Sequence, residues 1–156
     1  MPADSDPVPT LPHTYRPLGA RIATAVAAGA IVFIMTLLWV SLPDEVQDQF
    51  STFQRITLIG FFVVVLVVLN AIFRTRARAD EGGLSVVNGY HRRDLEWGQI
   101  VRISMGPHRP WALIDLDDGS TMSVMAIQSA DGARARSSTR ELAAVIAQQT
   151  RTERNT

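Results

Sequence analysis

The side chains in this chain best suited to catalysis are its three histidines, His13, His91 and His108. A serine or threonine nucleophile needs a base such as histidine within hydrogen-bond reach. No serine or threonine here lies in a G-x-S-x-G segment. Two histidines in the body of the chain, without any cysteine, also make a poor zinc site. The sequence therefore predicts no catalytic, metal-binding or cofactor-binding residue, and we expect a protein that is not an enzyme.

Three aspartates, Asp115, Asp117 and Asp118, form the densest acidic group. Calcium takes about six to eight oxygen ligands, and this segment lacks the later glutamate that completes a calcium-binding loop. Asp118-Gly119 is instead typical of a tight turn between two antiparallel strands. The pattern favours a hairpin over a metal site.

Arginines are the more serious binding candidates, because all fifteen basic residues are arginine and none is lysine. A lysine-free composition is typical of a GC-rich genome and indicates an actinobacterial source. Fifteen acidic residues balance the arginines, so the net charge gives no attraction to nucleic acid. We expect several arginines, with one tryptophan as an anchor for a partner or for the membrane surface, to lie on strands and loops that can converge. These candidate ligand- or partner-binding residues are Arg92, Arg93, Arg102, Arg109 and Trp111.

Two uncharged apolar runs, residues 22–42 and 56–73, divide the chain. Each reaches the length of about 17–25 apolar residues that a helix needs to cross a bilayer. The first run is longer than a signal-peptide core and no A-x-A site follows it, so we expect an uncleaved hairpin. Arginines flank the outer ends of the hairpin while its connection is acidic, which predicts both termini in the cytoplasm at the cell membrane. The arginines predicted to lie at the membrane surface are Arg16, Arg21, Arg74, Arg76 and Arg78.

The remaining segments suggest one small cytoplasmic domain. We expect disordered tails at residues 1–15 and 151–156, a transmembrane hairpin at 16–78 and a domain at 79–150. Alternating apolar residues predict strands at 84–87, 90–95, 100–105, 111–116 and 120–127, with a turn at Asn88-Gly89 where both residues take positive φ. Along 100–105 the alternation places Val101, Ile103 and Met105 on one face. Trp97 is expected in the core.

A helix is predicted to follow these strands. Ser138 and Glu141 have the spacing of a capping box, which predicts a helix beginning at that point. Its apolar stripe of Leu142, Val145 and Ile146 is expected to cover the open end of the sheet.

The ordered set of short motifs in this region resembles a known family. An Arg74-x-Arg76 exit from the second apolar run is followed by Ala79-Asp80, by Gly83-Leu84-Ser85-Val86, by Leu95-Glu96-Trp97-Gly98-Gln99-Ile100 and by Leu116-Asp117-Asp118-Gly119. This set is similar to that of the small bacterial pleckstrin-homology (PH)-like domain of actinobacterial membrane proteins, the low-molecular-weight protein antigen 6 type. The resemblance implies a two-helix transmembrane hairpin plus an α+β domain, in which a curved antiparallel sheet forms a partial barrel with a C-terminal helix. It assigns no catalytic residues. The strands predicted above are fewer than the seven of a full PH barrel.

These observations predict a non-enzymatic, membrane-anchored PH-like module that faces the cytoplasm and tethers a partner protein or the membrane surface. One alternative is a sensor of anionic lipid headgroups that uses Arg92, Arg93 and Arg109. Another is an accessory subunit that acts through its helices in a larger membrane complex. The expected partners are membrane lipids and an unidentified membrane or cytoplasmic protein, with no nucleic acid and no cofactor.

Overall fold

The computed structural model describes residues 9–153 of the chain. The protein divides into two compact units. A helical unit comprises Ala20–Phe73, and a sheet-containing unit combines the residues before it with those from Arg74 onward. The sheet-containing unit is therefore built from both sides of the helical unit in the sequence.

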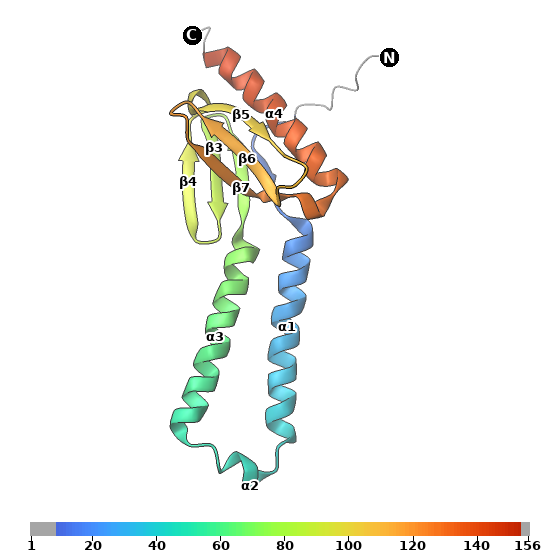
Figure 1. The fold of residues 1–156 in the computed structure, drawn as a ribbon, viewed down its shortest axis with the longest axis vertical. Coiled ribbons are helices and arrows are strands. Elements are labelled where there is room, and N and C mark those ends of the chain that lie inside the picture. Colours follow the sequence, from blue (N-terminus) through green and yellow to red (C-terminus); the bar gives the residue numbers. More distant parts are fainter. Residues whose placement is uncertain (1–8, 154–156) are drawn as a thin grey trace. The chain divides into compact units, whose positions relative to one another are not determined.

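The helical unit consists of two long helices joined by a short one (Figure 1). Helices α1 (Leu18–Ser41) and α3 (Thr52–Arg74) flank α2 (Asp44–Gln47). Both long helices are long and apolar enough to cross a membrane, with mean hydropathies of 2.2 and 2.9. Their apolar windows are only 6% and 0% buried, so these side chains do not form the core of a soluble domain. Two helices that could span a membrane are thus present.

Polar side chains close the turn between these helices. The Gln47 amide donates to the carbonyls of Trp39 and Leu42 at 3.2 and 3.0 Å, which adds hydrogen bonds to the carbonyls at the end of α1. Arg55 donates to the carbonyls of Gln47 and Phe50 at 2.6 and 3.1 Å. The guanidinium of Arg55 therefore organises this turn.

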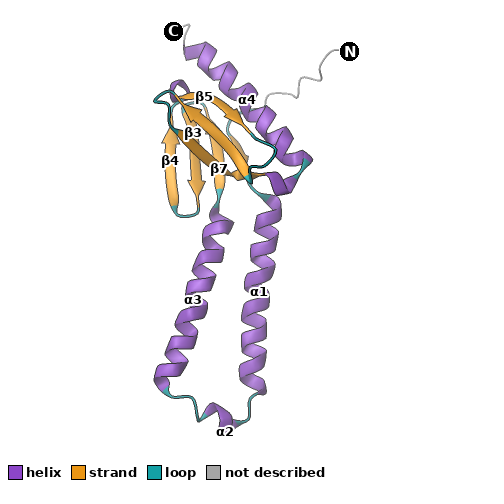
Figure 2. Cartoon of the chain, viewed as in Figure 1, coloured by secondary structure: helices purple, strands orange, loops and turns teal. Residues whose placement is uncertain are grey.

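The sheet-containing unit has two antiparallel sheets and one long helix (Figure 2). The first sheet has the order β1 (His13–Tyr15), β2 (Arg76–Asp80), β3 (Gly83–Asn88), β4 (His91–Leu95). The second has the order β5 (Ile100–Ser104), β6 (Trp111–Leu116), β7 (Thr121–Gln128). A short turn η1 (Trp97–Gln99) links the sheets, and η2 (Ser129–Asp131) leads into α4 (Ala133–Glu153). The two sheets do not close into one continuous barrel.

Seven strands in the described residues correct the sequence prediction, which missed β1 and β2. Residues 13–15 were predicted to be a disordered tail, but they pair with β2, and Tyr15 is buried in the core. In β2, Ala77 and Ala79 are fully buried, while Arg76 and Arg78, which alternate with them, are exposed. The domain therefore begins before residue 79 and includes a strand from before the helical hairpin. Residues 1–8 and 154–156 lie outside the described residues.

The first predicted turn is displaced by one residue. Asn88 pairs with His91 as the last residue of β3, and the turn is Gly89-Tyr90. Gly89 has a φ of 65°, whereas no described residue other than glycine has a positive φ. The Asn88 side chain instead joins the two sheets, because its amide nitrogen donates to the Ser123 carbonyl at 2.7 Å and its amide oxygen accepts from the Met125 N–H at 3.1 Å.

The expected alternation in β5 is broken by a bulge. The register with β6 shifts between Ile100 and Arg102, so an extra residue is accommodated there. As a result Ile100 and Ile103 are buried, whereas Val101 is 60% exposed. The prediction that Val101 and Ile103 share one face is therefore wrong.

Helix α4 begins at Ala133, five residues before the predicted start. Ser138 lies inside the helix, so the proposed capping box does not mark its N-terminus. The helix also continues through residues 151–153, which were predicted to be a tail. The predicted stripe is confirmed, because Leu142, Val145 and Ile146 are all buried.

The core joins both sheets and α4 in one apolar cluster. Trp97 lies in it at 1% exposure, as predicted, and its indole N–H donates to the Asp80 carbonyl at 3.1 Å. Asp131, after β7, accepts from the N–H groups of Leu18 and Gly19 at 3.2 and 3.0 Å. The first turn of α1 is thus capped by a side chain from more than a hundred residues later.

Candidate functional site

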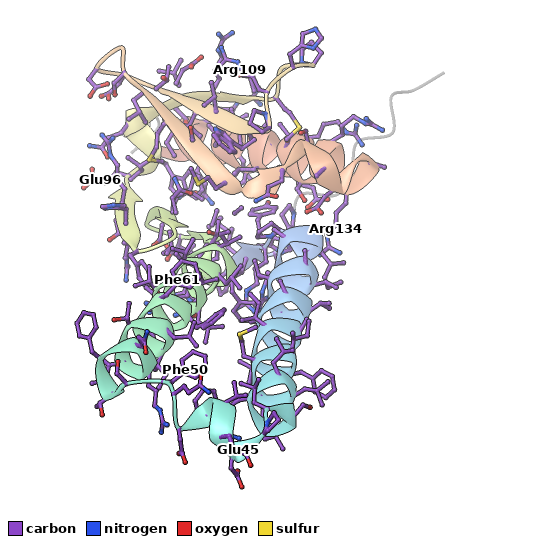
Figure 3. All side chains as sticks on the ribbon, turned by 60° about the horizontal axis from the view of Figure 1, so that its bottom comes forward. Glu45, Phe50, Phe61, Glu96, Arg109 and Arg134 are labelled. Carbon is purple, nitrogen blue, oxygen red and sulfur yellow. The ribbon has the colours of Figure 1, made fainter. Side chains whose placement is uncertain are left out.

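The arginines predicted to bind a ligand lie in different surroundings. Arg92 and Arg93 are on β4, Arg102 is on β5, and Arg109 lies in the loop before β6. Arg92 lines a polar groove together with Glu96, whereas Arg102 lines a groove against α4. Figure 3 shows Arg109 and Glu96 on separate parts of the surface. The structure therefore does not gather Arg92, Arg102 and Arg109 around one cavity.

Neighbouring carboxylates form ion pairs with two of these four arginines. Arg92 contacts Asp94 at 3.0 Å, and Arg102 contacts Asp115 across the β5–β6 ladder at 2.5 Å. A hydrogen bond from the Ser85 side chain lowers the pKa of Asp94 below its ordinary value, and Arg92 adds a smaller effect in the same direction. The pairs lie at the surface, where each contributes little to stability. They do, however, reduce the positive potential available to a headgroup.

Arg93 is near the aspartates of the second hairpin. Hydrogen bonds from Ser120 hold the pKa of Asp118 below its ordinary value, and Arg93 adds a smaller effect in the same direction. Asp118 accepts from the Ser120 N–H at 2.8 Å, and Gly119 has a φ of 80°. The hairpin interpretation of this acidic segment is therefore confirmed. Among the residues that the structure describes, no group of three or more histidine, cysteine, aspartate or glutamate side chains could hold a metal ion.

The remaining predicted residues have structural surroundings of their own. Trp111 begins β6 and is half-buried. The guanidinium of Arg74 lies 5.4 Å from the ring centre of Tyr90, and that of Arg21 lies 4.4 Å from the ring centre of Phe73. Cation–π contacts at such distances stabilise the pair modestly. Arg16, Arg76 and Arg78 are exposed.

A groove between β5 and α4 contains residues that the sequence did not single out. Its volume is about 410 Å³. Val101 and Ile103 contribute from the strand, and Ala143, Ile146 and Ala147 contribute from the helix. Because alanines stand at two positions four residues apart, the helix face leaves room beside the strand. Arg102 and Arg151 also line this groove, and among the described residues no acidic side chain lines it. The bulge that exposes Val101 and the extension of α4 to Arg151 gave no recognisable signal in the sequence.

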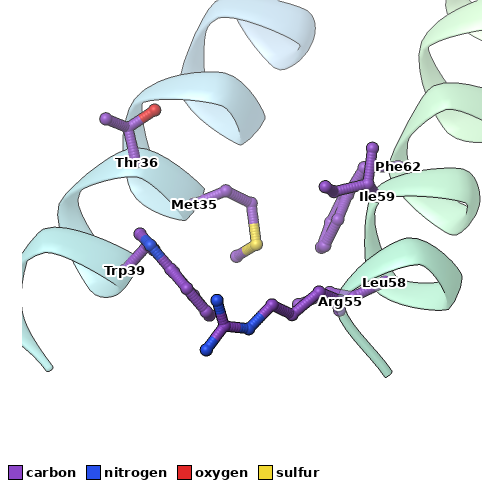
Figure 4. Close-up of a pocket in the computed structure, with 7 residues that line it drawn as sticks. All are labelled: Met35, Thr36, Trp39, Arg55, Leu58, Ile59 and Phe62. Atoms are coloured by element: carbon purple, nitrogen blue, oxygen red, sulfur yellow. The ribbon is translucent and has the colours of Figure 1, made fainter. Parts of the chain in front are cut away.

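A second groove of about 410 Å³ lies between the helices of the helical unit (Figure 4). Its lining is almost wholly apolar, with Met35 and Trp39 from α1 and Ile59 and Phe62 from α3. Arg55 lies at this groove, 5.4 Å from the ring centre of Trp39, and is held by the turn carbonyls. Such a lining is complementary to hydrocarbon and offers little to a polar ligand.

An antiparallel seven-stranded unit capped by one C-terminal helix defines a PH-like domain, a binding fold without a catalytic centre of its own. The family model for the bacterial PH domain matches residues 74–144. Uncharacterized proteins from Mycobacterium tuberculosis (Rv1417) and Mycobacterium bovis (Mb1452) are each 33% identical to the chain over 127 residues. Each match covers 80% of this chain and 78% of the relative. The chain belongs to the bacterial PH domain family. No solved structure matches it significantly.

Proposed function

We propose that this protein is a membrane-anchored tether. Two helices would cross the cell membrane, and the PH-like module would hold a protein partner at the cytoplasmic face. The observation that carries this proposal is the direct connection between anchor and module. Helix α3 ends at Arg74 and β2 begins at Arg76, so one residue separates them. A module held this way meets membrane-bound partners at a raised effective concentration.

Strand pairing supports the placement of both hairpin ends on one side of the membrane. β1 precedes the helical hairpin and β2 follows it, yet Tyr15 stands opposite Ala77 and His13 opposite Ala79. Two strands of one sheet must occupy the same compartment. The excess of arginine at these ends, against an acidic connection, favours the cytoplasm.

A protein partner is favoured over a lipid headgroup by the charges of the domain. Headgroup recognition typically uses a cluster of about 4–8 basic residues. Here Arg92 and Arg102 contact carboxylates, and Arg93 lies near Asp118. A tether for a protein requires no such cluster.

The absence of cysteine makes the orientation directly testable, because each introduced cysteine is the only one. Ser51→Cys lies in the connection and Ser104→Cys in the domain, and both serines are exposed. A membrane-impermeant maleimide should label Ser51→Cys in intact cells and Ser104→Cys only after permeabilisation. The opposite pattern, or equal labelling of both in intact cells, would overturn the proposed orientation.

The partner class is tested by photo-crosslinking in the membranes of the native host. A photoreactive amino acid would replace, one at a time, His91, Val101 or Thr121, all exposed on different strands. We expect a discrete protein adduct from at least one position, unchanged in an Arg92→Ala, Arg93→Ala, Arg109→Ala variant. Lipid adducts alone, lost in the triple variant, would support the headgroup sensor instead. A protein adduct that persists when the sheet-containing unit is deleted, formed from the helices, would support the accessory subunit.

A further inference from the structure

Strand β5 has one unpaired edge. It is the first strand in the order β5-β6-β7 and pairs only with β6. The Ile100 N–H donates to the Trp97 carbonyl, but in the described part of the chain no segment other than β6 forms backbone hydrogen bonds to residues 101–104. An edge of this kind presents free N–H and C=O groups that another chain can pair with.

The groove between β5 and α4 borders this edge and has an apolar floor. Val101 is exposed beside buried Ile103, and Ile146 with Ala147 forms the opposite wall. Peptides that add a strand to a sheet edge obtain affinity from main-chain hydrogen bonds and specificity from pockets for alternate side chains. The regular part of β5, from Arg102 to Ser104, would pair with a short extended segment. The floor and the edge together are suited to an extended peptide.

The charge of the groove selects among such peptides. Two arginines line it, Arg102 on the strand and Arg151 on the helix, and none of the described side chains that line it is acidic. Asp115 engages Arg102 through Nε, but the Arg102 side chain remains 72% exposed. Its remaining N–H groups can bind a second carboxylate, since a guanidinium carries five donors.

We infer that the β5–α4 groove binds an extended, acidic segment of the partner protein, which pairs with the free edge of β5 and places carboxylates against Arg102 and Arg151. This inference rests on the proposed function and specifies the partner's chemistry. The bulge at Val101 would limit pairing to the regular part of the strand from Arg102 onward.

Other surfaces are less suited to a strand. The polar groove beside β3 and β4 is lined by Asp80, Asp94 and Glu96 together with Arg92. Three carboxylates against one arginine make this lining acidic, so it disfavours an acidic segment. The groove between α1 and α3 is complementary to hydrocarbon.

The test uses the full chain in nanodiscs of zwitterionic lipid and labelled seven-residue peptides of alternating valine and glutamate. The matched probes replace glutamate by lysine, or carry N-methyl groups on alternate backbone nitrogens. We expect the glutamate peptide to bind at least about tenfold more tightly than the lysine peptide, because two charge-assisted hydrogen bonds are lost and two repulsions are gained. N-methylation should abolish binding, and the bound peptide should slow hydrogen exchange in residues 102–104.

Variants locate the peptide. Arg102→Gln with Arg151→Gln should weaken binding at least about tenfold, whereas Arg92→Gln, an exposed arginine on β4, should leave it unchanged. Because Arg102 also holds Asp115, Arg151→Gln alone serves as a second variant that leaves this pair intact, with an expected loss of several-fold. Equal binding of the glutamate and lysine peptides, binding unaffected by N-methylation, or no binding at all would overturn the inference.

Failure of this inference can be distinguished from failure of the proposed function. A protein adduct in native membranes from His91 or Thr121, together with no peptide binding in the groove, would support the proposed tether and overturn the proposed peptide site. Lipid adducts alone would overturn the proposed tether.

Discussion

The bridge made by Asn88 should be a principal link between the two sheets of the domain. Its side chain donates to the Ser123 carbonyl and accepts from the Met125 N–H, at 2.7 and 3.1 Å. The two β7 residues are half-buried, so water only partly replaces a lost partner. In Asn88→Ala both hydrogen bonds disappear, and the adjoining backbone groups lose their partners.

The expected cost follows from these two bonds. A net contribution of about 0.5–1.5 kcal/mol for each gives a destabilisation of about 1–3 kcal/mol. For a domain of this size each kcal/mol lowers the Tm by about 4–8 °C, so a central value of about 2 kcal/mol corresponds to about 8–16 °C. Asn88→Asp should be at least as damaging at neutral pH, because an anionic oxygen would then face the Ser123 carbonyl.

Thermal unfolding of the full chain in detergent, followed by tryptophan fluorescence, to which buried Trp97 contributes together with Trp39 and Trp111, measures the shift. Hydrogen exchange of the Met125 amide provides a local reading and should accelerate in Asn88→Ala before global unfolding. His91→Ala, a neighbouring exposed residue on the same hairpin, is the control and should change the Tm by no more than a degree or so. A Tm for Asn88→Ala within that control range would refute the idea that this side chain holds the sheets together.

Two further predictions concern single buried positions. The Tyr15 hydroxyl is buried without a hydrogen-bond partner in the described residues, and burial, with a smaller effect of Glu141, raises its pKa. Tyr15→Phe should therefore leave the Tm unchanged or raise it, and a loss of more than about 1 kcal/mol in chemical unfolding would reveal a partner for the hydroxyl. A Cβ at Gly83 would clash with the Leu95 carbonyl oxygen, whereas at Gly119 it would meet open space. Gly83→Ala should accordingly prevent stable folding. Gly119→Ala should cost only about 1 kcal/mol, because alanine is disfavoured in the left-handed backbone conformation of this residue. Similar unfolding curves for the two variants would contradict the close approach of β3 to Leu95.

Local patterns predicted much of the fold because tertiary contacts agreed with them. The apolar runs, the second hairpin, Trp97 in the core and the buried stripe of α4 all follow from periodicity and turn chemistry. β2 was missed because its buried residues are alanines that alternate with charged residues, and arginines after an apolar run are also typical of membrane topology. β1 was missed because a three-residue strand carries no periodicity.

The candidate site was harder to predict for a related reason. Arginines were chosen from the sequence by residue type, but whether a charge is available depends on its neighbours across strands. Arg102 and Asp115 are thirteen residues apart in sequence and meet only through the β5–β6 register. The exposure of Val101 likewise results from a bulge that no local pattern marks.

The two missed strands change what counts as the functional unit of this protein. A fragment of residues 79–150, the domain predicted from the sequence, omits β1 and most of β2. It would remove buried Tyr15 and Ala77 from the core and leave most of β3 as an open edge. β1 precedes the hairpin and β2 follows it. If the hairpin crosses the membrane as proposed, the first sheet is complete only when both of its ends are on the same side. Folding of the module and insertion of the proposed anchor would then be coupled through the pairing of β1 with β2.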